Sequence, residues 1–158
     1  MKKMMFAGET RCGKSSLIRA LSGESYTPRR AMAVEYFGPF INTPGEFLEN
    51  SWFYHALITS SADCHVLALV QDSTRRTSLF PPLFASMFNR TVLGIVTKTD
   101  SPDADPVLAE RFLRQAGAKK IIRTSSVSGE GIEEILSVLN SSDAGPAMED
   151  SRKLEENR

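Results

Sequence analysis

The sequence predicts an α/β fold of three layers, in which helices cover both faces of a mostly parallel β-sheet. A glycine-rich loop at residues 8–15 follows a short apolar segment and precedes an amphipathic one. Two near-continuous apolar runs, residues 65–70 and 91–97, are typical of strands buried on both faces. Segments with helical spacing alternate with these strands, and this order favours right-handed β–α–β connections.

The first half of the chain is divided by local pattern and turn residues. In order, we predict the strand 3–7, the helix 16–21, the strands 33–37 and 40–41, the helix 51–60 and the strand 65–70. Weak alternation of apolar and polar residues favours an edge strand at 33–37. Helical spacing predicts that Trp52 and the apolar face of helix 51–60 belong to the core. That face consists of Phe53, Ala56, Leu57 and Ile58.

The second half continues the alternation. In order, we predict the helix 79–88, the strand 91–97, the helix 106–116, the strand 120–124 and the helix 132–139. Pro81 and Pro82 fit a helix only in its first turn. The helix 106–116 is expected to turn Val107, Leu108, Phe112 and Leu113 inward and to end at Gly117. Residues 1–140 form one predicted domain, and 141–158 a polar disordered tail, with a docking helix at 148–157 as the alternative.

The glycine-rich loop has the spacing of a nucleotide phosphate site, with two glycines five apart followed by Lys and Ser. Gly8 and Gly13 are expected to allow positive φ, so that successive N–H groups point at the phosphates. Lys14 would place its charge between the β- and γ-phosphates, and the Ser15 hydroxyl can bind Mg²⁺. The N-terminus of the following helix, beginning near Ser16, adds a favourable field for anions.

Composition narrows the class of partner. The 158 residues carry no net charge, so a nucleic-acid partner is not expected. No stretch approaches the ~20 apolar residues of a membrane helix, and the apolar N-terminus is too short for a secretion signal, so we expect a soluble cytoplasmic protein. Cys12 and Cys64 lack metal-site spacing and are expected to be reduced thiols.

Residues 97–100 follow the best strand and resemble the base-recognition motif of the Ras-like GTPases. Asp100 can accept hydrogen bonds from guanine N1–H and the 2-amino group, which adenine does not offer, and the Lys98 stem can cover the base. Ser125 and Ser126 take the place of that superfamily's next motif, where N–H groups could meet guanine O6. The residues expected to bind nucleotide are Gly8, Glu9, Thr10, Arg11, Cys12, Gly13, Lys14, Ser15, Ser16, Gly45, Thr97, Lys98, Asp100, Ser125 and Ser126.

Residues 42–45 take the place of the motif that meets the γ-phosphate, and Gly45 N–H can bond to it. Asn42 stands where the superfamily has an Asp that holds Mg²⁺, so Ser15 and Asn42 are the expected metal residues and metal affinity should be low. Glu46 replaces the Gln that orients water; it and Lys14 are the candidate catalytic residues. Thr10 should crowd the space of an arginine finger, and Thr27 is the only candidate switch threonine before Asn42. These departures predict slow hydrolysis.

The chain also resembles a narrower family, the bacterial ethanolamine-utilisation protein P and propanediol-utilisation protein V. The most specific stretch is Thr43-Pro44-Gly45-Glu46-Phe47-Leu48-Glu49-Asn50, and residues 33–36, 54–58, 70, 80–82, 94–98 and 115–118 add to it. The resemblance covers residues 1–139 and implies a Ras-like P-loop fold. It also implies a role in ethanolamine or propanediol catabolism, association with microcompartment shell or cargo proteins, and acetate kinase activity. The family usually has Asp at position 42 and Lys-Thr-Gln at residues 30–32.

Three functions are therefore open. The first is a guanine-nucleotide-binding protein that uses GTP or GDP with Mg²⁺ and hydrolyses GTP slowly, if at all. The second is a kinase that moves the γ-phosphate of ATP to acetate or another short acid, with Arg11, Arg29 and Arg30 as candidate carboxylate partners. The third is a partner-binding module with a vestigial nucleotide site. His55 and His65 are expected to be structural.

Overall fold

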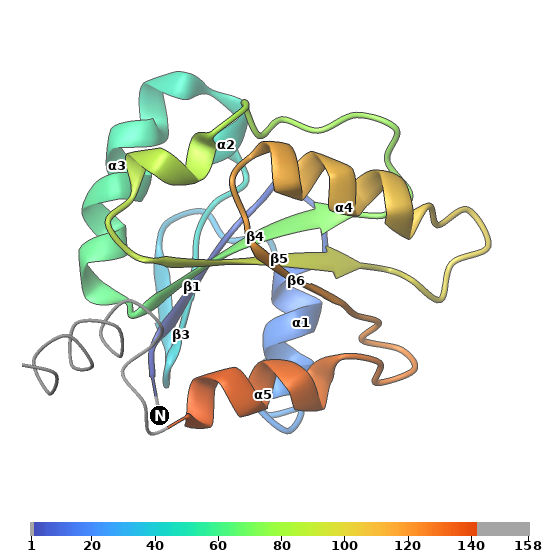
Figure 1. Cartoon of the computed structure of the whole chain (residues 1–158). Coiled ribbons are helices and arrows are strands. Elements are labelled where there is room, and N and C mark those ends of the chain that lie inside the picture. Colours follow the sequence, from blue (N-terminus) through green and yellow to red (C-terminus); the bar gives the residue numbers. More distant parts are fainter. Residues whose placement is uncertain (1, 142–158) are drawn as a thin grey trace, which may run out of the picture.

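In a computed structural model that describes residues 2–141, six strands form one sheet in the order β2-β3-β1-β4-β5-β6 (Figure 1). The strands are β1 Met4–Ala7, β2 Glu35–Phe37, β3 Phe40–Asn42, β4 Val66–Asp72, β5 Thr91–Thr97 and β6 Lys120–Arg123. Every neighbouring pair is parallel except β2 and β3, which are antiparallel. The mostly parallel sheet and the edge position of β2 are confirmed.

Helices lie on both faces of the sheet, which gives the three predicted layers (Figure 1). The helices are α1 Lys14–Leu21, α2 Glu46–Glu49, α3 Tyr54–Ser60, α4 Pro106–Gln115 and α5 Ile132–Asn140, with 3₁₀ turns η1 Ser51–Phe53, η2 Ser61–Asp63 and η3 Phe84–Met87. Alternate residues of β1 face opposite layers. Met4 and Phe6 pack with α1 and α5, while Met5 and Ala7 pack with α2, α3 and α4.

The strand order reverses at β1, because the chain runs from β1 to β3 on one side and to β4 on the other. Ligands of open parallel sheets bind beyond the carboxyl ends of the strands at such a reversal. The segments after β1, β3, β4, β5 and β6 all emerge at that edge. The fold therefore collects the predicted motifs at one end of the sheet.

The predicted helix over residues 79–88 is wrong. Only Phe84–Met87 forms a 3₁₀ turn. The two prolines supply no N–H donors, and Leu83 has φ 60°, a left-handed conformation that interrupts a right-handed helix. Three phenylalanines nevertheless point into the core, at 80, 84 and 88. Because these three buried residues are spaced four apart, the sequence shows a helical pattern although the segment forms only a 3₁₀ turn.

The region around residues 46–60 also differs from the prediction. A short helix, α2, precedes a 3₁₀ turn, and α3 begins only at Tyr54. Asn50 ends α2, and its side chain accepts a 3.1 Å hydrogen bond from Trp52 N to start the turn. Leu57 is fully buried as expected, but Trp52 is 88% exposed and Phe53 lies at the surface. The core assignment of those two aromatic residues is wrong.

The helix predicted over residues 106–116 is confirmed as α4, but Val107 does not face inward as expected. Asp105 caps α4 by accepting a 3.1 Å hydrogen bond from Leu108 N. Val107 is 59% exposed, whereas Ala109 and Leu113 are buried. The predicted tail at 141–158 lies, beyond residue 141, outside the described residues. No helix within residues 2–141 is long and apolar enough to cross a bilayer.

Candidate nucleotide site

The loop at residues 8–15 joins β1 to α1 and is tightly packed. Gly13 has φ 107°, as expected, and the other left-handed residue is Arg11 at 67°. Gly8 does not have positive φ. A Cβ at this position would lie 2.6 Å from Cys12 Sγ and 2.7 Å from the Val70 carbonyl oxygen. Gly8 is therefore required by space, and the expectation of positive φ there is wrong.

The Lys14 side chain lies across this loop. Its Nζ donates to the carbonyl oxygens of Gly8 at 2.7 Å and Glu9 at 2.9 Å, and lies 3.6 Å from Cys12 Sγ. Only 7% of Lys14 is exposed. Burial raises the pKa of the Cys12 thiol, although Lys14 opposes the shift. Lys14 thus has a fixed position at the centre of the loop, beside a neutral thiol.

The segment after β5, predicted to recognise a base, is bonded directly to the predicted phosphate loop. Thr97 Oγ1 donates to the Cys12 carbonyl oxygen at 2.5 Å. Lys98, at φ 62°, donates through Nζ to the Arg11 carbonyl oxygen and to Asp72 Oδ2, both at 2.8 Å. These bonds align the two loops with each other.

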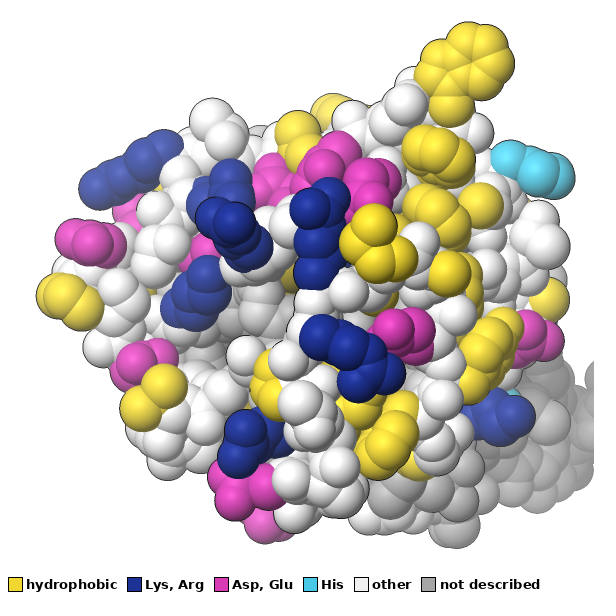
Figure 2. Space-filling model, turned by 180° about the vertical axis from the view of Figure 1, so that it is seen from behind, with side chains coloured by type: hydrophobic (Ala, Val, Ile, Leu, Met, Phe, Trp, Pro, Cys, Tyr) yellow, Lys and Arg dark blue, Asp and Glu magenta, His cyan; other side chains and the backbone are white. Residues whose placement is uncertain are grey.

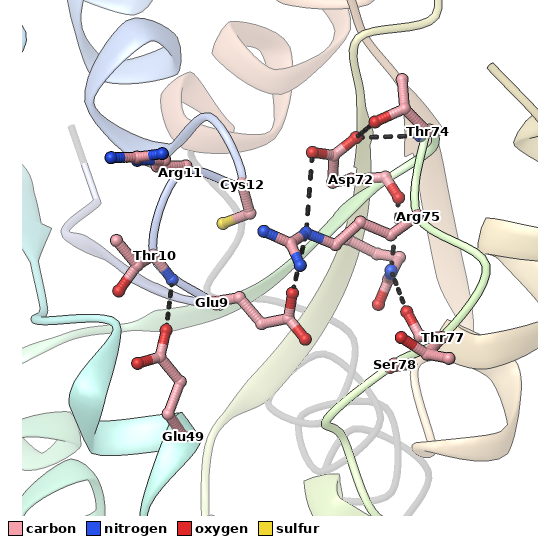
Figure 3. A network of polar contacts seen from close by, with 12 residues as sticks. Glu9, Thr10, Arg11, Cys12, Glu49, Asp72, Thr74, Arg75, Thr77 and Ser78 are labelled. Atoms are coloured by element: carbon pink, nitrogen blue, oxygen red, sulfur yellow. Dashed lines mark hydrogen bonds and ion pairs between the residues drawn. The ribbon is translucent and has the colours of Figure 1, made fainter. Parts of the chain in front are cut away.

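Asp72, at the end of β4, orients that lysine. Burial would raise the pKa of the Asp72 carboxyl, but hydrogen bonds from Lys98 and Thr74 outweigh burial and lower the pKa. Arg75 lies between this carboxylate and Glu9, with Nε 3.0 Å from Glu9 Oε2 and 3.9 Å from Asp72 Oδ2 (Figure 3). The pKa of Glu9 is raised by burial, which Arg75 partly offsets. Sequence reasoning missed Asp72, although its place after a buried strand at this edge was a usable signal.

Asp100 and Ser125 lie together beyond β5 and β6. The Ser125 hydroxyl donates to Asp100 Oδ1 at 2.8 Å, and the N–H groups of Val127 and Ser128 donate to that hydroxyl. Ser125 is buried, whereas Asp100 and Ser126 are exposed. The Asp100 carboxylate is thereby oriented by Ser125 while it stays open to solvent.

The predicted metal residues also meet. Asn42 is buried, its Nδ2 donates to Ser15 Oγ at 3.3 Å, and its Oδ1 has no hydrogen-bond partner among residues 2–141. Ser15 Oγ in turn donates to the Arg29 carbonyl oxygen at 2.5 Å. The Asn42 atom that faces the Ser15 hydroxyl is the amide nitrogen, so a Mg²⁺ held by both residues would require the amide to turn its unpaired Oδ1 toward Ser15. Thr27, the candidate switch threonine, does not line the pocket that these segments surround, which is described below.

The segment after β3 covers the loop. Gly45 packs against Thr10 so closely that a Cβ would lie 2.3 Å from both Thr10 N and Thr10 Oγ1. Glu46 pairs with Arg30 at 3.2 Å, and Glu49 Oε2 accepts a hydrogen bond from Thr10 N at 2.8 Å (Figure 3). Sequence reasoning identified Gly45 and Glu46 but gave Glu49 no role, because its partner lies 39 positions earlier in the chain.

These segments surround a pocket of about 580 Å³. Its walls are formed by Thr10, Arg11, Gly13, Lys14, Ser15, Ser16, Pro28, Arg29, Arg30, Ala31, Asn42, Thr43, Gly45 and Lys98. Five of these residues are Lys or Arg and none is Asp or Glu, so the pocket suits an anion. Gly8, Glu9, Cys12, Thr97, Asp100, Ser125 and Ser126 do not line this pocket.

The histidines take no part in this pocket. His65 Nδ1 accepts a hydrogen bond from Lys3 N at 2.9 Å at the start of β4, and His55 is exposed on α3. Cys64 is buried, which raises the pKa of its thiol to about 11. Among residues 2–141, no three His, Cys, Asp or Glu residues gather as a metal cluster.

The sheet order, the two helical layers and the loop between β1 and α1 define a P-loop protein of the three-layer Ras-like class. The sequence profile of the ethanolamine utilisation and propanediol utilisation family, PduV-EutP, matches residues 1–141, and the chain belongs to this family. It is 37% identical over 145 residues to the propanediol utilization protein PduV of Citrobacter freundii, covering 91% of this chain and 97% of that protein. It is 30% identical over 144 residues to the probable acetate kinase EutP of Escherichia coli K12, covering 89% and 91%.

A solved structure confirms the fold. The bacterial selenocysteine-specific elongation factor EF-Sec superposes with a TM-score of 0.60 at 22% identity, covering 87% of this chain. This chain spans 28% of the length of the elongation factor. The likeness concerns the fold alone.

Proposed function

We propose that the protein binds guanine nucleotides, hydrolyses GTP slowly if at all, and acts in ethanolamine or propanediol utilisation at a bacterial microcompartment. The observation that carries the proposal is the junction between the base-recognition and phosphate loops. Lys98 bonds to Arg11 and Asp72, and Thr97 bonds to Cys12. A base and a phosphate bound to these two loops would be held at a fixed separation.

Guanine specificity rests on the carboxylate of Asp100. Ser125 fixes one carboxylate oxygen, so the group is oriented before a base binds. Guanine can satisfy a carboxylate with two N–H donors, whereas adenine would leave it partly unpaired. The Lys98 stem, on the same loop, would cover the base.

Phosphate binding rests on the loop amides and Lys14, within a pocket lined only by cationic and neutral side chains. Ser15 and Asn42 would hold Mg²⁺, which supplies charge neutralisation between the phosphates. Because Asn42 lacks the negative charge of a carboxylate, we expect this metal to bind weakly.

Slow hydrolysis rests on the groups near Gly45. The Glu46 carboxylate pairs with Arg30 through Oε1 and does not line the pocket, so it is not placed to orient a water there. Thr10 fills the space against Gly45, where an inserted arginine would need room. Neither position offers the transition-state stabilisation that accelerates phosphoryl transfer.

The direct test is calorimetric titration with GDP, GTP and ATP, with and without Mg²⁺. We expect binding of GDP and GTP but not ATP, weak dependence on Mg²⁺, and loss of binding in Lys14→Ala. Arg19→Ala is a matched control, because it removes a cation from an exposed position of α1 that does not line the pocket. Unchanged GTP affinity in Lys14→Ala would refute the proposal.

One observation favours a second function, a kinase for a short acid. Arg11, Arg29 and Arg30 line the pocket, and the E. coli relative is named a probable acetate kinase. Guanidinium groups bind carboxylates bidentately, and transfer to a positioned carboxylate needs no water-orienting group. Binding of ATP alone in the titration, with acyl phosphate trapped as hydroxamate, would establish this function in place of the first.

A further inference from the structure

The Glu49 carboxylate belongs to neither the predicted nucleotide ligands nor the core. Oε2 accepts the Thr10 N–H hydrogen bond at 2.8 Å, across 39 positions of sequence. That hydrogen bond lowers the pKa of Glu49, with Lys14 and Arg30 contributing through their charges. The group is therefore ionised at neutral pH and within electrostatic range of both cations.

The hydrogen bond holds α2 against the phosphate loop. Gly45, immediately before α2, is packed on Thr10 without room for a Cβ. Thr10 Oγ1 is buried there and has no hydrogen-bond partner among the described residues. Glu49 and Gly45 thus both contact Thr10. These contacts hold the phosphate loop against the segment that is expected to meet a terminal phosphate.

We propose that Glu49 determines how many phosphates the nucleotide site accepts, favouring a nucleoside diphosphate over a triphosphate. This inference rests on the proposed function. Glu49 does not line the pocket, but its partner Thr10 does, so a γ-phosphate brought to Gly45 and Lys14 adds negative charge beside the contact between Glu49 and Thr10. Glu49 itself is exposed, but its carboxylate already occupies the Thr10 N–H, so a third phosphate placed against this end of the loop competes with Glu49 for that donor, whereas a diphosphate leaves the bond intact.

Release of Glu49 would move the surface that follows it. Trp52 lies three positions later, is the only tryptophan of the chain, and is 88% exposed. Apolar side chains gather on the right of the face shown in Figure 2, beside Lys and Arg in the centre and on the left. Trp52 lies in η1, directly after α2, so its fluorescence is a probe placed next to the segment that Glu49 holds.

The experiment measures GDP and GTP affinity in the full chain and in Glu49→Gln and Glu49→Ala. We expect both variants to bind GTP about tenfold more tightly, the scale of one charge-assisted hydrogen bond, while GDP affinity stays within about twofold. Glu134→Gln, an exposed acidic residue at the start of α5, is the matched control and should leave both affinities unchanged.

Trp52 emission gives a second readout that does not depend on an affinity ratio. In the unaltered protein GTP should change the emission and GDP should not, and Glu49→Ala should show the changed emission before nucleotide is added. If the GTP-to-GDP ratio is the same in all three proteins, Glu49 does not set phosphate number and this inference fails alone. If the unaltered protein binds no guanine nucleotide, the proposed function fails with it.

Discussion

At the scale of single residues, Gly8 and Gly45 are required because a side chain would clash with neighbouring atoms, and not because their backbone needs a positive φ. A side chain at Gly8 would collide with Cys12 and Val70, and one at Gly45 would collide with Thr10. The sequence pattern had singled out both positions as nucleotide contacts, which remains a prediction. It could not indicate the reason at Gly8, because the colliding atoms come from another strand and from the far side of the loop.

Position 42 allows a direct test of the proposed metal site, because Asn and Asp differ there only in an amide nitrogen against a carboxylate oxygen. Asn42→Asp should tighten Mg²⁺ binding in the presence of GTP by about tenfold, because a carboxylate restores the charge that hard cations prefer. Without Mg²⁺ the variant should be less stable, because a buried carboxylate beside Ser15 lacks a cationic partner. Magnesium titration followed by thermal unfolding measures both effects.

Asn42→Ala serves as the comparison, since it removes the oxygen altogether. It should show no gain in metal affinity. Equal Mg²⁺ affinity in Asn42→Asp and the unaltered protein would mean that position 42 is not near the metal.

At the scale of elements, residues 79–88 show how side-chain spacing can mislead. Phe80, Phe84 and Phe88 are all buried, and successive ring centroids lie 5.5 and 5.2 Å apart. An interval of four satisfies a helical pattern, but here an irregular segment places the rings in the core. Leu83, at φ 60°, makes a continuous helix impossible.

The central ring of this cluster should contribute strongly to stability. Phe84 also packs edge-on against Tyr54 of α3, with ring centroids 5.3 Å apart. Phe84→Ala should lower the free energy of unfolding by about 3–5 kcal/mol through lost contacts and a cavity. Leu83→Ala, at a residue that is 67% exposed, should change it by less than ~0.5 kcal/mol. Urea unfolding of both variants tests this, and similar costs at the two positions would contradict the packing described.

At the scale of the whole molecule, parallel topology made most of the site predictable. Once parallel strands are predicted to begin at residues 3, 65, 91 and 120, the segments that follow them must lie at the same edge of the sheet. The structure places them there. The contacts of Glu49 and Asp72 were not predictable. Each depends on a side-chain partner that only the folded chain brings near, at Thr10 and Lys98.

The ion pairs that join these loops should make the stability of the whole fold depend on pH. The pKa of Asp72 is lowered, so its ionised form stabilises the folded state above the unfolded value of about 3.9. This stability is lost as the pH falls through the lowered value. Glu9 acts in the opposite direction: because its pKa is raised, its contribution is present at low pH and lost as the pH rises.

A matched variant separates Asp72 from these opposing contributions. Asp72→Asn keeps the shape but removes the charge that faces Lys98 at 2.8 Å. At pH 7 the variant should be less stable by roughly 1–3 kcal/mol, the range for hydrogen bonds to charged groups. The difference should shrink as the pH falls below ~4, because protonated Asp and Asn are then alike. Urea unfolding of both proteins between pH 7 and 3 measures the difference, and a constant gap would mean that the pair with Lys98 does not carry the stability assigned to it.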